Sequence, residues 1–148
     1  MDCIFCRIVE KTEPSWVVYE DDVHIAFLTP FPNTPGFTVL IPKEHLPSDV
    51  LAMEEGRYLE LMSAAKKLAA ILNEKLGTKR TGLIIEGMGV DHAHVKLIPM
   101  HGIGAGEWKP ILSSIAEFSE TYKGYLSTHD GPRMNDKELE ILKNRILG

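Results

Sequence analysis

Long apolar runs and an excess of positive charge are both missing from this sequence. No apolar stretch approaches the ~20 residues that a membrane-spanning helix needs, and the start of the chain lacks the basic-then-apolar order of a secretory leader. There are 16 Lys and Arg against 21 Asp and Glu, a formal net charge of −5. This balance argues against a broad nucleic-acid surface but leaves room for a small phosphorylated ligand beside a local basic cluster. We expect a cytoplasmic protein without nucleic-acid or membrane partners.

Cysteine is also scarce, because Cys3 and Cys6 are the only two and lie together in Cys-Ile-Phe-Cys. A redox C-x-x-C usually follows a strand and opens a helix, whereas almost no chain precedes this one. Half of a zinc site is the better interpretation, provided that two more ligands come from elsewhere. Two small buried residues in a reducing compartment are the simpler alternative.

What the sequence does have is an alternating stretch over residues 90–99. Apolar residues alternate with His92, His94 and Lys96, which is the period of a half-buried strand. Two imidazoles and an ammonium on one face are costly to desolvate together without a partner. An anion or a metal ion is the natural counterpart, and a solvent-facing basic strand is the simpler alternative. The glycine-bearing turn over residues 86–89 precedes this stretch.

The remaining patterns predict a single α+β domain with a helical extension. The expected elements are a short helix over residues 4–9, strands over 16–20, 23–28, 37–41, 81–86 and 91–100, a long helix from Glu54 or Gly56 to Leu76, a helix over 110–122 and a last helix capped by Asn135. The five strands are expected to form a mainly antiparallel sheet with the long helix across one face. We assign residues 1–103 to this domain and residues 104–148 to an extension packed on it or on a second subunit.

These motifs, taken in order, resemble the histidine triad (HIT) family of nucleotide hydrolases and transferases. The resemblance covers about two-thirds of the chain, from Cys3 to about His101. Its motifs are Cys-Ile-Phe-Cys, Tyr-Glu-Asp at 19–21 with Ala-Phe-Leu at 26–28, the run Pro-Gly-Phe-Thr-Val-Leu-Ile-Pro-Lys-Glu-His at 35–45, and His-Ala-His-Val-Lys at 92–96. The family fold is a curved antiparallel sheet with a helix, and most members are dimers. The resemblance therefore implies a homodimer.

The resemblance also implies a chemistry. His94 matches the family's nucleophile, which attacks the α-phosphorus of a nucleotide and forms a nucleotidyl-histidine that water then hydrolyses. Neutral imidazole is nucleophilic near neutral pH, and covalent catalysis divides one difficult displacement into two easier ones. Members with an N-terminal C-x-x-C hold zinc through residues that match Cys3, Cys6, His45 and His92. Such a Cys₂His₂ set is closed, so the zinc is expected to be structural.

The substrate pocket follows the family less closely. The resemblance places Phe27, Leu28, Thr29 and Pro30 at the base and ribose, and Glu86, Gly87, Met88 and Gly89 in the phosphate loop. Thr29 stands where members commonly have an aspartate that accepts from the ribose hydroxyls. Lys96 replaces the third histidine, and an ammonium is a poor proton shuttle at neutral pH.

The sequence accordingly predicts a zinc-containing hydrolase or transferase that acts at the α-phosphate. Its expected substrates are dinucleoside polyphosphates or nucleoside phosphoramidates, with His94 and Lys96 as the catalytic residues. The alternative is a nucleotide- or partner-binding module with the same fold and little turnover.

Overall fold

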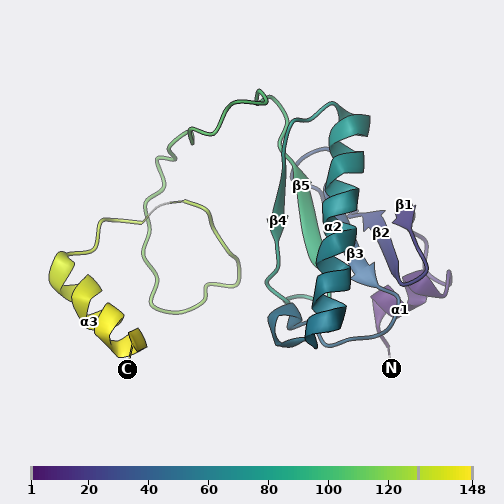
Figure 1. The fold of residues 1–148 in the computed structure, drawn as a ribbon, viewed down its shortest axis with the longest axis horizontal. Helices are drawn as coiled ribbons and strands as arrows, with labels where there is room; N and C mark the ends of the chain where they lie inside the picture. The colour runs from purple at the N-terminus through teal and green to yellow at the C-terminus, as the bar shows by residue number, and fades with distance from the viewer. Residues whose placement is uncertain (1, 130, 148) are drawn as a thin grey trace. The chain divides into compact units, whose positions relative to one another are not determined.

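The computed structural model describes residues 2–129 and 131–147. Its elements, labelled in Figure 1, are α1 (Ile4–Val9), β1 (Trp16–Glu20), β2 (His24–Leu28), β3 (Thr38–Pro42), the short 3₁₀ helix η1 (Val50–Ala52), α2 (Glu55–Leu76), β4 (Thr81–Ile84), β5 (Val95–Pro99) and α3 (Asp136–Leu147). Among these helices, none combines the length and the apolar character needed to cross a membrane.

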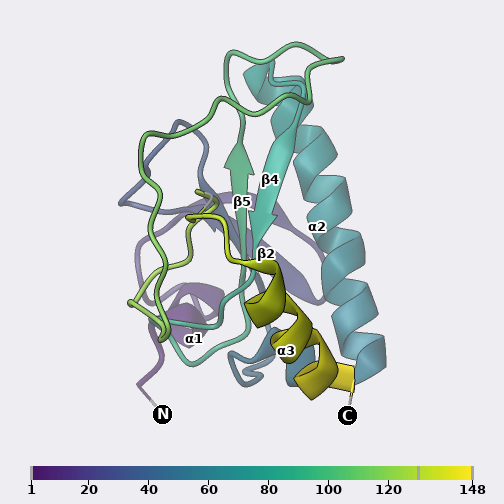
Figure 2. The same ribbon diagram turned by 90° about the vertical axis from the view of Figure 1, so that its left-hand side faces the viewer.

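The five strands form one sheet in the order β1-β2-β3-β5-β4, and every neighbouring pair is antiparallel. Figure 2 shows β4 and β5 running in opposite directions. The register places Val39 of β3 and Ile84 of β4 on either side of Lys96. The predicted α+β class, with a five-stranded antiparallel sheet, is confirmed.

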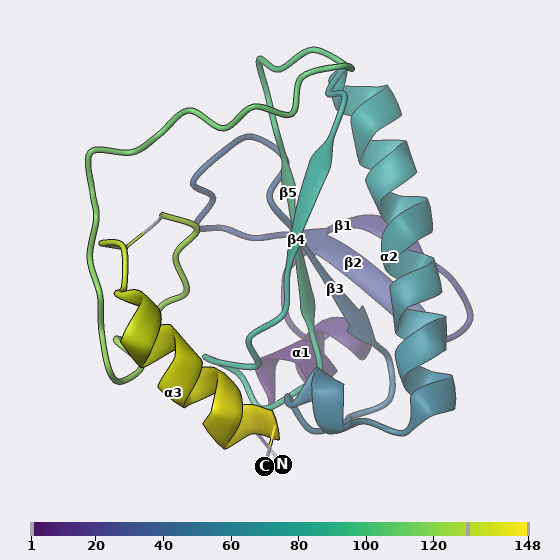
Figure 3. The ribbon, with the colours of Figure 1, turned by 60° about the vertical axis from the view of Figure 1, so that its left-hand side comes forward.

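The two faces of the sheet bury different groups. One face packs Ala26, Leu40, Val95 and Leu97 against α2, which runs along the sheet in Figure 3. The opposite face carries a second apolar cluster that includes α1, formed by Ile8, Ile25, Phe27, Val39 and Ile41. Lys96 is paired with Val39 and projects from this second face, and His94, just before β5, lines the same cavity as Ile8, Phe27 and Val39.

The long helix follows the sequence closely. Leu61, Leu68 and Leu72 recur at helical spacing and are buried against the sheet. The Glu54 side chain accepts hydrogen bonds from the amides of Gly56 and Arg57 at the helix start. Gly77 ends the helix with φ of 68°, a left-handed conformation that glycine adopts without a steric penalty.

The fifth strand is shorter than the alternation predicts, because it begins at Val95 and not at residue 91. The amide of His92 donates to the carbonyl of Val90, which closes a turn, and the amide of Ala93 donates to the carbonyl of Leu46. His92 lies in this turn and faces the thiols, whereas His94, also just before β5, lines the cavity together with Lys96. Alternation alone could not reveal this, since it does not specify the backbone partner.

A carboxylate organises the turn between β1 and β2. Asp21 accepts from the Tyr19 hydroxyl at 2.6 Å and from the amides of Val23 and His24 at 2.9 and 2.6 Å. Burial raises the pKa of Asp21, but these hydrogen bonds outweigh it and lower that pKa to about 2. The hydrogen bond to Asp21 is the main cause that raises the pKa of Tyr19 to about 12.

The chain divides into two compact units, one up to Glu107 and one from Trp108 onward. The helix predicted over residues 110–122 is wrong, because this segment has no regular secondary structure and its residues are exposed. Its apolar residues gain nothing from helical spacing without a surface to cover. The last helix is confirmed as α3, and the Asn135 side chain caps it by accepting from the amide of Glu138 at 2.9 Å.

Candidate functional site

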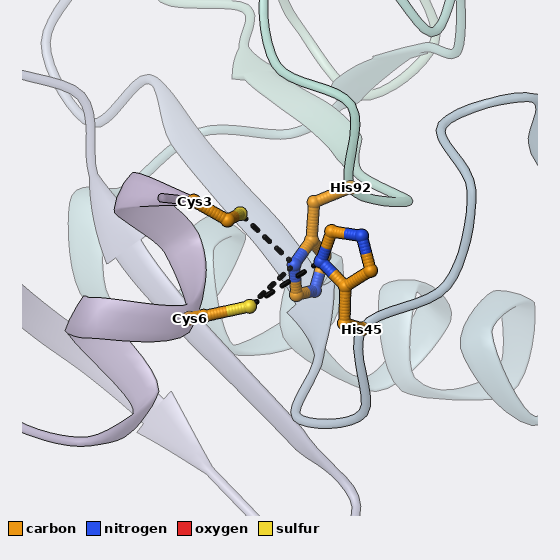
Figure 4. A group of neighbouring side chains, drawn as sticks. All are labelled: Cys3, Cys6, His45 and His92. Atoms are coloured by element: carbon orange, nitrogen blue, oxygen red, sulfur yellow. Dashed lines mark hydrogen bonds between the residues drawn. The ribbon is translucent and has the colours of Figure 1, made fainter. Parts of the chain in front are cut away.

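Four side chains from three separate segments of the chain lie close together at the start of α1. Cys3 directly precedes α1 and Cys6 lies in its first turn, while His45 comes from the loop after β3 and His92 from the turn before β5; Figure 4 shows the four side chains. Their ligand atoms all lie within 4.8 Å of one another. The Nδ1 atom of His92 is 3.5 Å from Cys3 Sγ and 3.6 Å from Cys6 Sγ, and His45 Nδ1 is 3.3 Å from Cys6 Sγ. The sequence-predicted ligand set is therefore brought together.

The cluster has the dimensions and chemistry of a zinc site. Zn–S and Zn–N bonds in tetrahedral geometry separate sulfur and nitrogen by about 3.6 Å, close to the distances found here. The second ring nitrogen of His92 donates to the carbonyl of Pro42 at 2.8 Å, which leaves the Nδ1 lone pair directed at the thiols. This arrangement fixes the tautomer that metal ligation requires.

The electrostatics of the cluster also favour a cation. Burial is the main cause that lowers the pKa of His92, so its imidazole stays neutral at physiological pH. Burial raises the pKa of the Cys6 thiol, and the adjacent Cys3 raises it further. Two thiolates at this separation repel each other unless a cation lies between them, and a divalent metal ion removes that penalty.

His94 faces a different environment, although it lies only two residues from His92. Its Nδ1–H donates to the carbonyl of His92 at 2.7 Å, so Nε2 carries the free lone pair. The side chain is 3% exposed, yet it lines a cavity of about 650 Å³ between α1 and the sheet. A buried imidazole with one nitrogen fixed and the other free is suited to act as a nucleophile or base.

The cavity is mainly apolar. Its walls are Ile4, Phe5, Ile8, Glu13, Pro14, Ser15, Trp16, Phe27, Leu28, Thr29, Pro30, Phe31, Phe37, Val39, Met88, Val90, His94 and Lys96. Of the predicted substrate-binding residues, the segment 27–30 and Met88 therefore line it, whereas Glu86, Gly87 and Gly89 are not among its wall residues. A space of this size with few polar groups fits a small organic ligand.

Lys96, a wall residue of the cavity, forms an ion pair with Glu86, which lies outside the wall. The exposed fractions of their side chains are 28% and 11%, so both groups are largely withdrawn from water. The Glu86 carboxylate thus points at the ammonium, which accounts for an acidic residue next to a predicted anion site. Of the described wall residues, Lys96 is the only Lys or Arg.

Comparison with known proteins identifies the domain. A family model described as the HIT domain matches residues 10–104. An uncharacterized HIT-like protein of Borreliella burgdorferi is 38% identical over 105 residues, which are 66% of this chain and 75% of that protein. The chain belongs to the HIT family.

Two further HIT relatives extend the comparison. The adenosine 5'-monophosphoramidase hnt1 of Schizosaccharomyces pombe is 31% identical over 111 residues, 72% of this chain and 83% of that protein. The crystal structure of SMU.412c from Streptococcus mutans UA159 has a TM-score of 0.69 and 28% identity, covering 99% of this chain and 83% of that one. The fold of the HIT domain is therefore the one predicted.

Sequence analysis missed one residue that contacts both halves of the HIT site. The Phe5 ring meets the rings of His92 and His94 edge to face, with centroid separations of 5.8 and 5.6 Å, and that of Phe27 at 5.5 Å. Its position between Cys3 and Cys6 was the available signal, because two ligands on one helical turn fix the direction of the side chain between them. Phe5 connects the four-ligand cluster to the cavity.

The loop between β4 and β5 packs against Ser48 at one end and is hydrogen-bonded to it at the other. Gly87 has φ of 70°, and a Cβ there would lie 2.7 Å from the carbonyl oxygen of Ser48. At the other end the Asp91 carboxylate accepts from the amide of Ser48 at 3.1 Å. The loop approaches this neighbouring backbone so closely that only glycine fits at position 87.

Proposed function

We propose that this HIT protein is a nucleotidyl hydrolase or transferase that acts at the α-phosphate of a nucleotide through His94. The observation that carries the proposal is the His94 imidazole, whose Nδ1–H is fixed by the carbonyl of His92 and whose Nε2 lone pair remains free beside the cavity. The phosphoramidase relative supports a nucleoside phosphoramidate as substrate, and a dinucleoside polyphosphate presents the same α-phosphorus.

The reaction proceeds in two displacements. The lone pair on Nε2 of His94 forms a bond to phosphorus while the bond to the leaving atom breaks, and that atom departs with the electron pair and takes a proton from solvent. Water then attacks phosphorus, the N–P bond breaks, the electron pair returns to Nε2, and the proton of the water goes to solvent. The carbonyl of His92 stabilises the imidazole while it carries positive charge.

The surrounding residues have separate roles in this proposal. Lys96 donates to the phosphoryl oxygens, where negative charge develops. The segment 27–30 and Met88 hold the nucleoside, and Met88 is the one residue of the predicted phosphate loop that lines the cavity. Thr29 offers one hydroxyl in place of a carboxylate, and its Oγ1 already accepts from the amide of Phe31 at 3.2 Å. We therefore expect weak recognition of the ribose.

Zinc is the proposed structural cofactor. Cys3, Cys6, His45 and His92 would hold it, and the bound ion would tie α1 to the turn before β5 without contacting the substrate. The chain's own residues complete the link, because Phe5 lies between the two cysteines and against the His94 ring. The four-ligand cluster would thus keep the nucleophile in place.

We further propose that the protein works in the cytoplasm as a homodimer, with residues 104–148 packed on its own domain or on a second copy. The support is the exposure of large apolar side chains in the unit that begins at Trp108. Ile111 and Ile146 are 98% and 82% exposed. Apolar surface of this extent is normally covered in a soluble protein. Sedimentation of the full chain and of residues 1–107 distinguishes the two, because packing on a second copy makes dimerisation depend on the extension, whereas packing on its own domain does not.

Trapping the intermediate tests the proposed activity. The protein is mixed with adenosine 5'-phosphoramidate, quenched in alkali, where a phosphohistidine bond survives, and analysed by intact mass and peptide mapping. A nucleotidyl adduct on His94, absent in H94A, is the expected result. Tight nucleotide binding without adduct or turnover would instead identify a HIT module that binds and does not catalyse.

A further inference from the structure

The sheet register explains how a further polar side chain, that of Glu86, reaches Lys96. Ile84 is paired with Lys96 across β4 and β5, and side chains of paired residues lie on the same face. Because strand side chains alternate, Glu86 continues the face of Ile84, two residues beyond the end of β4. Its carboxylate therefore arrives on the cavity face of the sheet and meets the Lys96 ammonium there.

The backbone of Glu86 is held by its neighbour. Gly87 lies against the carbonyl of Ser48 with no room for a Cβ, and the Asp91 carboxylate binds the amide of the same residue. Glu86 thus lies next to a residue packed closely against the backbone of Ser48, in a loop whose far end is hydrogen-bonded to Ser48, and its side chain is only 11% exposed. The Lys96 side chain is intrinsically more flexible, because an ammonium on a four-carbon chain reaches many positions unless a partner holds it.

The net charge of the cavity wall near Lys96 depends on the ion pair between Lys96 and Glu86. Lys96 is the only Lys or Arg among the described wall residues, and the other charged wall residue, Glu13, accepts from Arg7 Nε at 3.2 Å. With Glu86 in place, the cavity wall at Lys96 presents an oriented ammonium, and the ion pair as a whole carries no net charge. Without Glu86 it would present an unrestrained cation.

We propose that Glu86 is a positioning residue for Lys96, and this inference depends on the proposed function. The carboxylate holds the ammonium beside His94, so that an N–H is already directed at the phosphoryl oxygens when charge develops on them. It also weakens the attraction of the ammonium for the ground-state anion. The pair therefore favours the transition state over tight binding of the substrate.

The first test is the variant Glu86→Gln, assayed with nucleoside phosphoramidates. An amide has nearly the same shape but cannot anchor an ammonium by charge. We expect kcat to fall about tenfold or more, because the donor is no longer oriented. We also expect KM to fall severalfold, because the freed cation binds the ground-state phosphate more tightly. Unchanged kcat and KM would refute the proposal.

The matched control is Glu20→Gln, which breaks the ion pair between Glu20 and Lys43 (2.9 Å) outside the cavity. The two side chains are 39% and 28% exposed, so the control removes another part-exposed carboxylate–lysine contact. It should leave kcat and KM within about twofold of the wild type, as expected for an exposed pair.

A double-variant cycle separates positioning from simple structural support. The kcat of Lys96→Ala is compared with that of the double variant E86Q/K96A. If Glu86 acts through Lys96, removing Glu86 costs no further kcat once the ammonium is gone. A further fall of kcat in the double variant would show that the carboxylate acts independently of Lys96, and the proposal would be wrong.

Failure of this inference can be distinguished from failure of the proposed function. The adduct on His94 reports the function, and it should still form in E86Q, more slowly. If the wild type forms an adduct that H94A lacks while E86Q reacts at the wild-type rate, only the role of Glu86 is refuted. If the wild type forms no adduct with any phosphoramidate, the proposed function fails and the role of Glu86 fails with it.

Discussion

His92 and His94 are separated by one residue, yet their surroundings differ completely. Both rings are buried, and each donates one N–H to a backbone carbonyl, His92 to Pro42 and His94 to His92 itself. The remaining nitrogen of His92 faces two thiols, while that of His94 stays free beside the cavity. The same side chain therefore suits structural ligation in one position and nucleophilic attack in the other. What decides is whether thiols or open cavity face the ring nitrogen that does not donate to a carbonyl.

The comparison also explains why the two sites do not interfere. His92 lies in a turn before the sheet ladder, whereas His94 projects from the cavity face next to β5. Phe5 separates them, contacting both rings edge to face. A metal ion held by the four-ligand cluster would stay apart from the substrate, and the nucleophile would remain unligated.

Replacing each histidine separately is the most direct way to break the comparison. In H94A we expect hydrolysis of adenosine 5'-phosphoramidate to fall at least about a thousandfold, with a smaller loss of melting temperature than in H92A because no cluster ligand is removed. In H92A we expect the melting temperature to fall by several degrees, because a cluster ligand and a buried hydrogen bond are lost. Kinetics and thermal melts on both variants measure the contrast. Equal loss of stability in the two would contradict it.

Metal removal tests the structural role of the four-ligand cluster that contains His92. The purified protein should contain stoichiometric zinc by elemental mass spectrometry, and Cys6→Ser should abolish it. We expect chelation to lower the melting temperature by roughly 5 °C or more, since a ligand that binds only the folded state stabilises it by mass action. His129→Ala, which removes a histidine outside the cluster, is the control. A melting temperature that is indifferent to chelators would remove the proposed role of zinc.

Phe5→Leu sharpens the boundary between the two sites. Leucine keeps apolar volume between the cysteines but loses the edge-to-face contacts with both imidazoles. We expect kcat/KM to fall roughly three- to tenfold because the His94 ring is less firmly oriented, while zinc content is unchanged. Loss of zinc together with activity would show that Phe5 acts mainly through the four-ligand cluster.

The smallest expected effect concerns Asp21, at the turn between β1 and β2 and outside both sites. Its folded pKa of about 2 lies below the ordinary value of 3.8, so its contribution to stability is present above about pH 4 and is lost as the pH falls toward 2. Asp21→Asn should therefore melt roughly a few degrees below the wild type at pH 6, and the gap should close toward pH 2. Melts across this range test it, with exposed Asp22→Asn as the control.

Much of the fold could be predicted from local patterns. Leu61, Leu68 and Leu72 recur at helical spacing and Gly77 follows them, so the sequence alone predicts the α2 helix. Segment 110–122 misled prediction because its apolar residues have no surface in their own unit that would reward a helix. The four candidate ligands were found through family motifs, since spacing alone does not bring Cys3 and His45 together.

What the sequence by itself determined is the chemical inventory: which residues can bind a metal, attack phosphorus or carry charge, and which strands have a buried face. Only the tertiary structure decided how that inventory is divided. It turned His92 to the thiols and left His94 at the cavity, and it joined Glu86 to Lys96. The physical reason is that a polar side chain acquires its role from the partner that compensates its burial, and here those partners come from distant parts of the chain.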